Sequence, residues 1–338
     1  MTTSQQAKQL PAFSGNVLQR YIYALRPWSW TASIIPILVT SSLTAVDRGE
    51  EDGSDGNVSS LLTFRIIFLT LCIQAAANAI NTCEDFDNGV DKCEYAGGDR
   101  ALVDQIVCPK TLKVLGYALL SVGVAAAWPL LTQWKEVTGF TDVDFEDDVK
   151  FAAAALFAAG VTIAVMYTAP PLRLKYHALG DVAVFLSFGP ILMNFIGIVL
   201  TGKIQKDILN IPVVLPIGLL TVAILHGNNT RDIENDSRAG IHTLAVMLGF
   251  RLCRLMYFLI IISSYGTIMY LAYEKFIGLI VVFVTIPISV GLCKDFTPEK
   301  VYNADEETAK FHMLFGILMS LGIRLTPYAN DFIAKLKN

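Results

Sequence analysis

Nine long apolar runs constrain the fold of this chain more than any other feature of its sequence. Each approaches the roughly 20 residues that an α-helix needs to cross a bilayer. Backbone polar groups in lipid must be satisfied within the segment, so such runs predict helices. They lie near residues 28–46, 61–82, 111–132, 151–168, 179–201, 209–227, 250–273, 275–293 and 311–330. The sequence therefore predicts an all-α, polytopic membrane protein with about nine transmembrane helices.

Composition agrees with a single membrane domain, expected over residues 27–332 after a cytosolic segment of residues 1–26. Of the 338 residues, 54% are hydrophobic and 17% are charged, whereas a soluble domain carries about 25% charged residues. The N-terminal segment has no uninterrupted apolar stretch, so no cleavable signal peptide is expected. The six cysteines and four histidines form no zinc-binding spacing. No basic block indicates nucleic-acid binding.

The loops between the runs alternate in charge. Those after the second, fourth and sixth runs are basic, whereas those after the first and third are acidic. The positive-inside rule places the basic loops in the cytosol and, with nine spans, the C-terminus on the opposite side. The residues that carry this signal are Arg100, Lys110, Arg173, Lys175, Arg231, Arg238 and Arg251.

A first cluster of polar residues closes the second run. Asn78, Asn81 and Asp85 are three and four residues apart, so they share one face of a helix. Because polar side chains are costly inside a membrane, the two asparagines within the run indicate a functional site. The charged residues that follow are Asp87, Asp91, Asp99 and Arg100. The last acid of this cluster is left open between Asp87 and Asp91.

A second cluster closes the sixth run and has the stronger pattern. Asn228, Asp232 and Asp236 repeat every four residues, with Asn229 and Arg231 between them. Carboxylates grouped on one face repel one another unless a cation lies between them, and oxygen ligands suit magnesium. Each cluster supplies two or three oxygens, which leaves coordination positions for phosphate oxygens.

The first cluster ends the second run and the second cluster ends the sixth run. Because these runs are four apart in the sequence of spans, both cross the membrane in the same direction. That spacing is typical of a parallel repeat of helices with a site between the two halves. Gly89 and Gly240 are expected to provide the turns that follow the two clusters. The sequence thus predicts one magnesium-diphosphate site at the cytosolic edge of the membrane.

A third element follows the fourth run. Pro170 and its neighbour break the helix after Tyr167, which leaves Arg173 and Lys175 near the cytosolic edge and Asp181 a few residues later. Ordinary positive-inside anchoring would also explain the two bases. In combination with two acidic clusters they complete a diphosphate clamp.

These motifs resemble the UbiA superfamily of intramembrane prenyltransferases over roughly residues 20–330. The matching pieces are Asn81-x-x-x-Asp85, Asp99-Arg100, Tyr167, Lys175 and Arg231-Asp232-x-x-x-Asp236-x-x-Ala239-Gly240-x-x-Thr243-Leu244. The menaquinone-forming branch is the most similar, on Ala24-Leu-Arg-Pro-Trp-Ser29, Asp99-Arg-x-Leu-Val-Asp104 and Leu225-His-x-Asn-Asn-Thr-Arg-Asp-x-x-x-Asp236. The chain departs from many members at Thr82, where they have Asp, and at Gly89, where their last acid falls.

The resemblance implies a bundle of nine helices with a central cavity. It also implies magnesium-dependent transfer of a geranylgeranyl group from its diphosphate to a naphthoquinol, forming menaquinone. The expected magnesium ligands are Asp85, Asp91, Asp232 and Asp236. Diphosphate and substrate would contact Asn78, Asn81, Arg100, Arg173, Lys175, Asn228, Asn229 and Arg231. Tyr167 would stabilise the allylic cation, and Asp181 would accept the ring proton. Its animal members imply a location in the endoplasmic reticulum and Golgi.

Two alternatives remain at this stage. Another aromatic acceptor (4-hydroxybenzoate, homogentisate or haem) would use the same magnesium chemistry. A cation-coupled transporter would also place acids in the membrane, but near its midplane and on broken helices. A regulated partnership with other membrane proteins is compatible with catalysis and leaves no trace in the sequence.

Overall fold

The computed structural model describes residues 15–52, 58–91, 100–132, 138, 146–204 and 211–337. These residues form helices and turns, with no strand among them beyond an isolated bridge between His177 and His242. The α-helices are α1 (Val17–Ala24), α2 (Thr31–Asp52), α3 (Ser60–Asp87), α4 (Arg100–Val103), α5 (Pro109–Thr132), α7 (Glu146–Met166), α8 (Gly180–Leu186), α9 (Leu192–Thr201), α10 (Ile211–Arg231), α11 (Ile233–Arg238), α12 (Leu244–Glu274), α13 (Ile286–Asp295) and α14 (Ala304–Lys337). Shorter helical segments are η1 (Pro27–Trp30), η2 (Leu174–Tyr176), η3 (Ser187–Ile191), η4 (Ile277–Thr285) and η5 (Val301–Asn303).

Eight of the expected spans are helical segments long and apolar enough to cross a membrane, within the described residues. Three of them are composite: η1 with α2 forms one, α8, η3 and α9 together form another, and η4 with α13 forms the third. The ninth predicted run, 311–330, is helical as the middle of α14. It is not among the eight, because His312 and Arg324 interrupt its apolar sequence.

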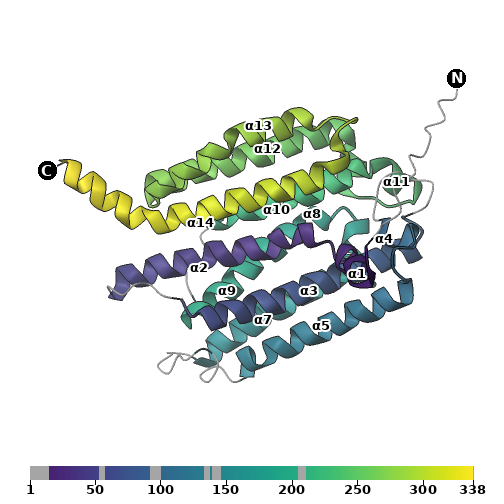
Figure 1. The fold of residues 1–338 in the computed structure, drawn as a ribbon, viewed down its shortest axis with the longest axis horizontal. Coiled ribbons are helices and arrows are strands. Elements are labelled where there is room, and N and C mark those ends of the chain that lie inside the picture. Colours follow the sequence, from purple (N-terminus) through teal and green to yellow (C-terminus); the bar gives the residue numbers. More distant parts are fainter. Residues whose placement is uncertain are drawn as a thin grey trace.

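The long helices lie side by side along one direction (Figure 1). Helix α14 packs against α2, α10 and η4, α12 packs against α10, and α3 packs against α5. The short helices α4 and α11 both lie at the right-hand end of this view, so α3 and α10 end at the same side of the bundle (Figure 1). This is the common side predicted from the spacing of the two polar clusters.

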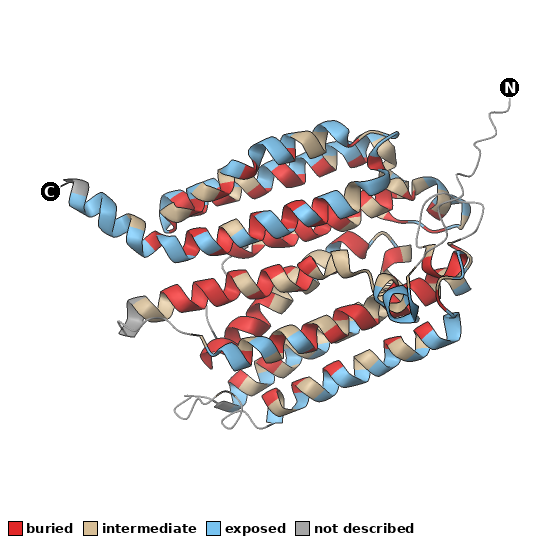
Figure 2. Ribbon diagram, viewed as in Figure 1, coloured by how far each residue is buried: buried red, intermediate tan, exposed pale blue. Residues whose placement is uncertain are grey.

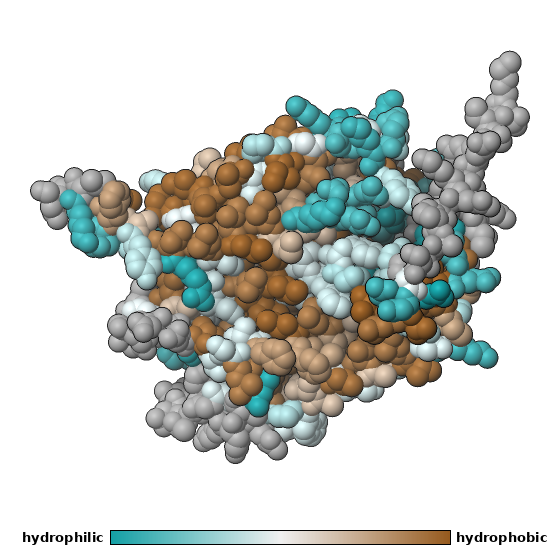
Figure 3. All heavy atoms as spheres, in the orientation of Figure 1, coloured by the Kyte–Doolittle hydropathy of each residue, from teal (hydrophilic) through white to brown (hydrophobic). Residues whose placement is uncertain are grey.

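The outer surface of the bundle is apolar. Figure 2 shows exposed residues along the outward faces of α5, α12 and α13, and Figure 3 shows hydrophobic side chains covering the middle of the molecule. Large side chains on this surface include Phe64, Trp128, Phe151 and Val284, all more than half exposed. In water such a surface would be very unfavourable, so it is the lipid-facing surface of a multi-pass integral membrane protein.

Glycines and prolines end or join the helices where the sequence predicts. Helix α3 ends at Asp87, and Gly89 adopts a positive φ of 70° just beyond it. Gly240 has a φ of 74° after α11. The chain leaves α7 at Met166 and turns through Pro170. These turns bring the polar clusters and the Lys175 segment to one end of the bundle.

Candidate active site

One cavity of about 1810 Å³ extends from the cluster end of the bundle toward its interior. Helices α3, α7 and α10, with the α8–η3–α9 segment, contribute its lining, and residues from α4, α11 and η5 contribute to its polar end. The polar end contains the side chains of both clusters. The other end is apolar, lined by Leu69, Ile73, Leu156, Phe157, Gly160, Ile191 and Phe195. This is the central cavity expected from the sequence, with charge at one end and hydrocarbon at the other.

The first cluster contributes three side chains from one face of α3, as predicted. Asn78, Asn81 and Asp85 all line the cavity. The Asn78 amide donates to the carbonyl of Leu25 at 2.9 Å and to the hydroxyl of Ser29 at 3.0 Å. Asn78 therefore fixes the segment before α2 against α3. The Asn81 Oδ1 is buried without a hydrogen-bond partner in the described part of the chain.

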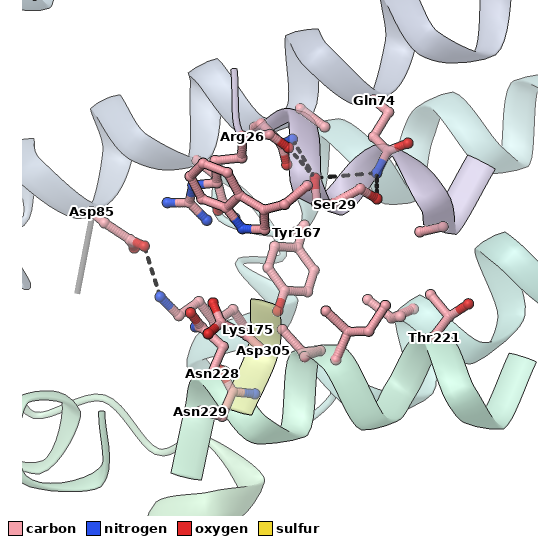
Figure 4. A pocket seen from close by; sticks show the side chains of 18 of the residues that line it. Arg26, Ser29, Gln74, Asp85, Tyr167, Lys175, Thr221, Asn228, Asn229 and Asp305 are labelled. Carbon is pink, nitrogen blue, oxygen red and sulfur yellow. Dashed lines mark hydrogen bonds and ion pairs between the residues drawn. The ribbon is translucent and has the colours of Figure 1, made fainter. Parts of the chain in front are cut away.

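Asp85 is the centre of a buried charged group (Figure 4). Its carboxylate is 4% exposed and accepts a hydrogen bond from Lys175 Nζ at 2.7 Å and another from the Tyr176 hydroxyl at 2.8 Å. The Lys175 backbone N–H donates to the carbonyl of Tyr167 at 2.8 Å, so the turn after α7 holds the lysine in place. Burial lowers the pKa of Lys175, but Asp85 and Asp236 more than offset this effect and the pKa lies above its usual value. Lys175 is therefore a fixed positive charge at the polar end.

The second cluster lies where α10 meets α11. The helical path breaks at Asp232, whose backbone N–H still bonds the carbonyl of Asn228 at 3.1 Å. Arg231 turns back over this break and donates to both oxygens of Asp232, at 2.9 and 2.8 Å, and to Asn228 Oδ1 at 2.6 Å. Its guanidinium also lies 3.3 Å from Asp305, in the first turn of α14. All four side chains line the cavity.

Asp236 is a buried carboxylate at the polar end of the cavity. It is 2% exposed, and its Oδ2 has no hydrogen-bond partner among the described residues. Burial raises the pKa of Asp236 to about 6, an effect that Lys175 opposes and that Asp232 and Asp85 strengthen. An added positive charge at this position would stabilise the carboxylate.

The oxygens available at the polar end fit a hard divalent cation. Three buried oxygens, Asn81 Oδ1, Asn229 Oδ1 and Asp236 Oδ2, have no hydrogen-bond partner within the described ranges. In the same ranges no three acids, histidines or cysteines are close enough to hold a metal ion by themselves. Magnesium bound through one or two carboxylates and completed by substrate phosphates fits this donor set.

The structure separates the two candidates for the last acid of the first cluster. Asp87 is an exposed residue whose carboxylate lies 3.2 Å from Lys113 of α5, and it does not line the cavity. Asp91 does line the cavity, as does Arg100, whose guanidinium is paired with Asp104. Asp99, the partner of Arg100 in the sequence motif, is outside the described residues.

Two residues expected at the site lie elsewhere. Arg173 does not line the cavity; its guanidinium stands over the ring of Tyr176 at 5.8 Å. Asp181 is buried but does not line the cavity either, and its Oδ1 faces His226 Nδ1 at 3.4 Å. The role expected for Asp181, as acceptor of the ring proton, stays a prediction. Tyr167 lines the cavity as expected, between the Ser29–Gln74 pair and α10 (Figure 4).

Sequence reasoning missed several residues that line the cavity. Gln74 lies one helical turn before Asn78, so the spacing of the α3 face already contained the signal. It donates to the carbonyl of Ser29 at 2.7 Å. Asp305 carried no signal, because its role depends on α14 starting beside α10. Other polar lining residues without a clear signal are Arg20, Arg26, Ser33, Thr221, Tyr302 and Glu306.

Comparison with known proteins agrees with this architecture. Residues 149–318 match the UbiA prenyltransferase family. The chain is 33% identical to UbiA prenyltransferase domain-containing protein 1 of Danio rerio, over 91% of this chain and 84% of that protein. The Homo sapiens protein of the same name is 31% identical over the same shares.

Solved structures of lower identity have the same fold. A UbiA homolog from Archaeoglobus fulgidus has a TM-score of 0.58 at 16% identity, over 90% of this chain and 96% of that one. The same homolog solved with GPP and Mg2+ has a TM-score of 0.55 at 13% identity, over 89% and 99%. The chain belongs to the UbiA prenyltransferase family and is an intramembrane prenyltransferase of that type.

Proposed function

We propose that this prenyltransferase transfers a geranylgeranyl group from its diphosphate to the ring of a naphthoquinol, with menaquinone as the product. The observation that carries the proposal is the division of one cavity into a charged end and an apolar end. An isoprenyl diphosphate has the same division, and a cavity within the membrane accommodates its tail without exposing it to water.

The charged end would bind the diphosphate. Lys175, Arg231 and Arg100 are positioned to contact its oxygens, and Asn228 and Asn229 can donate amide hydrogen bonds. Asp85, Asp91, Asp232 and Asp236 would hold magnesium, which neutralises the leaving group's charge. The archaeal relative solved with GPP and Mg2+ supports this choice of substrate and ion.

The middle of the cavity would hold the reacting carbon and the acceptor. As the carbon–oxygen bond breaks, positive charge develops on the allylic group, and the faces of Tyr167 and Trp28 can stabilise it. Ser29, Gln74 and Thr221 offer polar groups to the hydroxyls of a quinol bound beside them. The choice of a naphthoquinol rests on the sequence resemblance to the menaquinone-forming branch.

The charged end is proposed to face the cytosol, in membranes of the endoplasmic reticulum and Golgi. The basic loops support this orientation by the positive-inside rule. Single cysteines near Asn88 and Arg238, in a background without native cysteines, should both react with an impermeant maleimide from the cytosolic side. A cysteine near Lys275, at the other end of α12, should not. Labelling of Asn88 and Arg238 from opposite sides would contradict a shared diphosphate site.

The activity is tested with purified protein, magnesium, labelled geranylgeranyl diphosphate and a panel of aromatic acceptors. We expect prenylation of a naphthoquinol, and we expect the Asp236→Asn variant to lose most of this activity. Product from 4-hydroxybenzoate, homogentisate or haem instead would retain the prenyltransferase and replace the acceptor. The transporter alternative is disfavoured, since Asp85 lies in the last turn of α3 and Asp232 and Asp236 follow the end of α10, instead of lying in the middle of a span.

A further inference from the structure

We propose that Lys175 and Arg231 each exchange partners during substrate binding. Without substrate, Lys175 pairs with Asp85 and Arg231 pairs with Asp232. With a magnesium-diphosphate bound, the two carboxylates would hold the metal and the two cations would turn to the diphosphate. The inference rests on the proposed function. On this proposal, Lys175 and Arg231 each compete with the metal for a carboxylate and also bind the diphosphate of the substrate.

The contacts of Asp85 carry the first step. Lys175 Nζ occupies its Oδ2 at 2.7 Å and the Tyr176 hydroxyl occupies its Oδ1 at 2.8 Å. Both partners are themselves mostly buried, and the lysine is 8% exposed. Each carboxylate oxygen keeps a second lone pair, so these hydrogen bonds do not by themselves exclude a metal ion. The ammonium of Lys175 does oppose one, because it would repel a divalent cation bound to the same carboxylate. Metal binding at Asp85 is therefore expected to move Lys175 away from the carboxylate.

The second cluster repeats the arrangement with different residues. Arg231 donates to both oxygens of Asp232, at 2.9 and 2.8 Å, in a bidentate pair. Asp236 lacks such a partner at Oδ2 within the described residues, which leaves it as the first contact for an arriving metal ion. The two halves of the bundle thus each contain one carboxylate already paired with a cation.

Charge explains why the exchange requires metal and diphosphate together. Metal alone would place a divalent cation beside Lys175 and Arg231, and like charges at close range in a buried site repel strongly. Diphosphate alone would approach Asp85, Asp232 and Asp236. When both bind, the carboxylates face metal and the two cations face phosphate oxygens, so each charge keeps a partner of opposite sign.

The test measures metal binding without turnover. Binding of Mn2+ to the purified protein is followed by electron paramagnetic resonance, with and without inorganic pyrophosphate. Lys175→Gln should bind Mn2+ alone about tenfold more tightly than the unmodified protein, because the competing charge is gone. The same variant should bind pyrophosphate more weakly in the presence of Mn2+.

A matched control and a second variant isolate the effect. Lys113→Gln also removes a lysine paired with an α3 acid, Asp87, but outside the cavity, so its Mn2+ affinity should be unchanged. Tyr176→Phe keeps the ring and removes one neutral hydrogen bond to Asp85 Oδ1; it should not reproduce the tenfold gain of Lys175→Gln, because it removes no positive charge. Melting temperatures verify that each variant is folded.

The outcomes separate the inference from the function. Unchanged or weaker Mn2+ binding in Lys175→Gln, with the unmodified protein binding Mn2+ and pyrophosphate together, would overturn the exchange and leave the proposed function standing. Absence of Mn2+ binding to the unmodified protein even with pyrophosphate would overturn the proposed magnesium-dependent function as well. Opposite changes in metal and pyrophosphate affinity in Lys175→Gln would establish the exchange.

Discussion

Substitutions at the buried pair of Asp181 and His226 test whether Asp181 stabilises the fold or acts on the substrate. His226 is fully buried on α10, its Nε2 lies 2.9 Å from the carbonyl of Cys253, and its Nδ1 faces Asp181. The carbonyl accepts a hydrogen bond when Nε2 carries hydrogen, and the carboxylate of Asp181 lies within ion-pair distance of Nδ1. We expect the pair to hold α8 against α10 and to take no part in proton transfer from the acceptor.

Replacing Asp181 by Asn should therefore destabilise the protein. Breaking a buried pair typically costs about 3–5 kcal/mol, since the remaining charge is uncompensated. The Asp181–His226 separation is 3.4 Å and neither atom meets hydrogen-bond geometry in the described structure. Charged hydrogen bonds are usually about 2.7–2.9 Å, so we place the loss at or just below the lower limit of this range, at roughly 2–3 kcal/mol.

The assay is thermal unfolding in detergent, with turnover measured well below the melting temperature. Asp181→Asn and His226→Gln should each lower the melting temperature by several degrees, and the double variant should lose less than the sum of the two. Turnover per folded molecule should fall only modestly in Asp181→Asn. If this variant melts like the unmodified protein but has lost turnover, Asp181 acts on the substrate and the reasoning from the structure is refuted.

Three further predictions follow from the cavity and the packing. Asp232→Asn and Asp236→Asn should each remove most turnover at unchanged fold, because an amide binds magnesium weakly; near-normal rates at saturating magnesium would contradict the assignment. Gly322→Ala should destabilise by about 2–3 kcal/mol, since its Cβ would lie 2.7 Å from a backbone oxygen of η4, whereas Gly266→Ala meets nothing within 4 Å; equal melting temperatures would argue against this packing. Gly160→Phe should fill the apolar end and favour geranyl over geranylgeranyl diphosphate in a competition assay; an unchanged preference would exclude this end as the tail site.

The sequence by itself determined the class of fold and the end of the bundle at which the site lies. A run of about 20 apolar residues can satisfy its backbone in lipid only as a helix, and this property is local. The number of spans between the two polar clusters then determines whether both clusters lie on the same side of the membrane. The face shared by Asn78, Asn81 and Asp85 follows from helical spacing alone.

Only the tertiary structure decided which charged side chains meet. Asp85 and Lys175 are 90 residues apart, and Arg231 and Asp305 are 74 apart. No spacing rule relates such residues, because their contact depends on how separate helices pack. Arg173 and Lys175 are both basic and nearly adjacent, yet only Lys175 is turned into the cavity. The packing of α8 on α10 likewise decided that Asp181 lies against His226 and does not line the cavity.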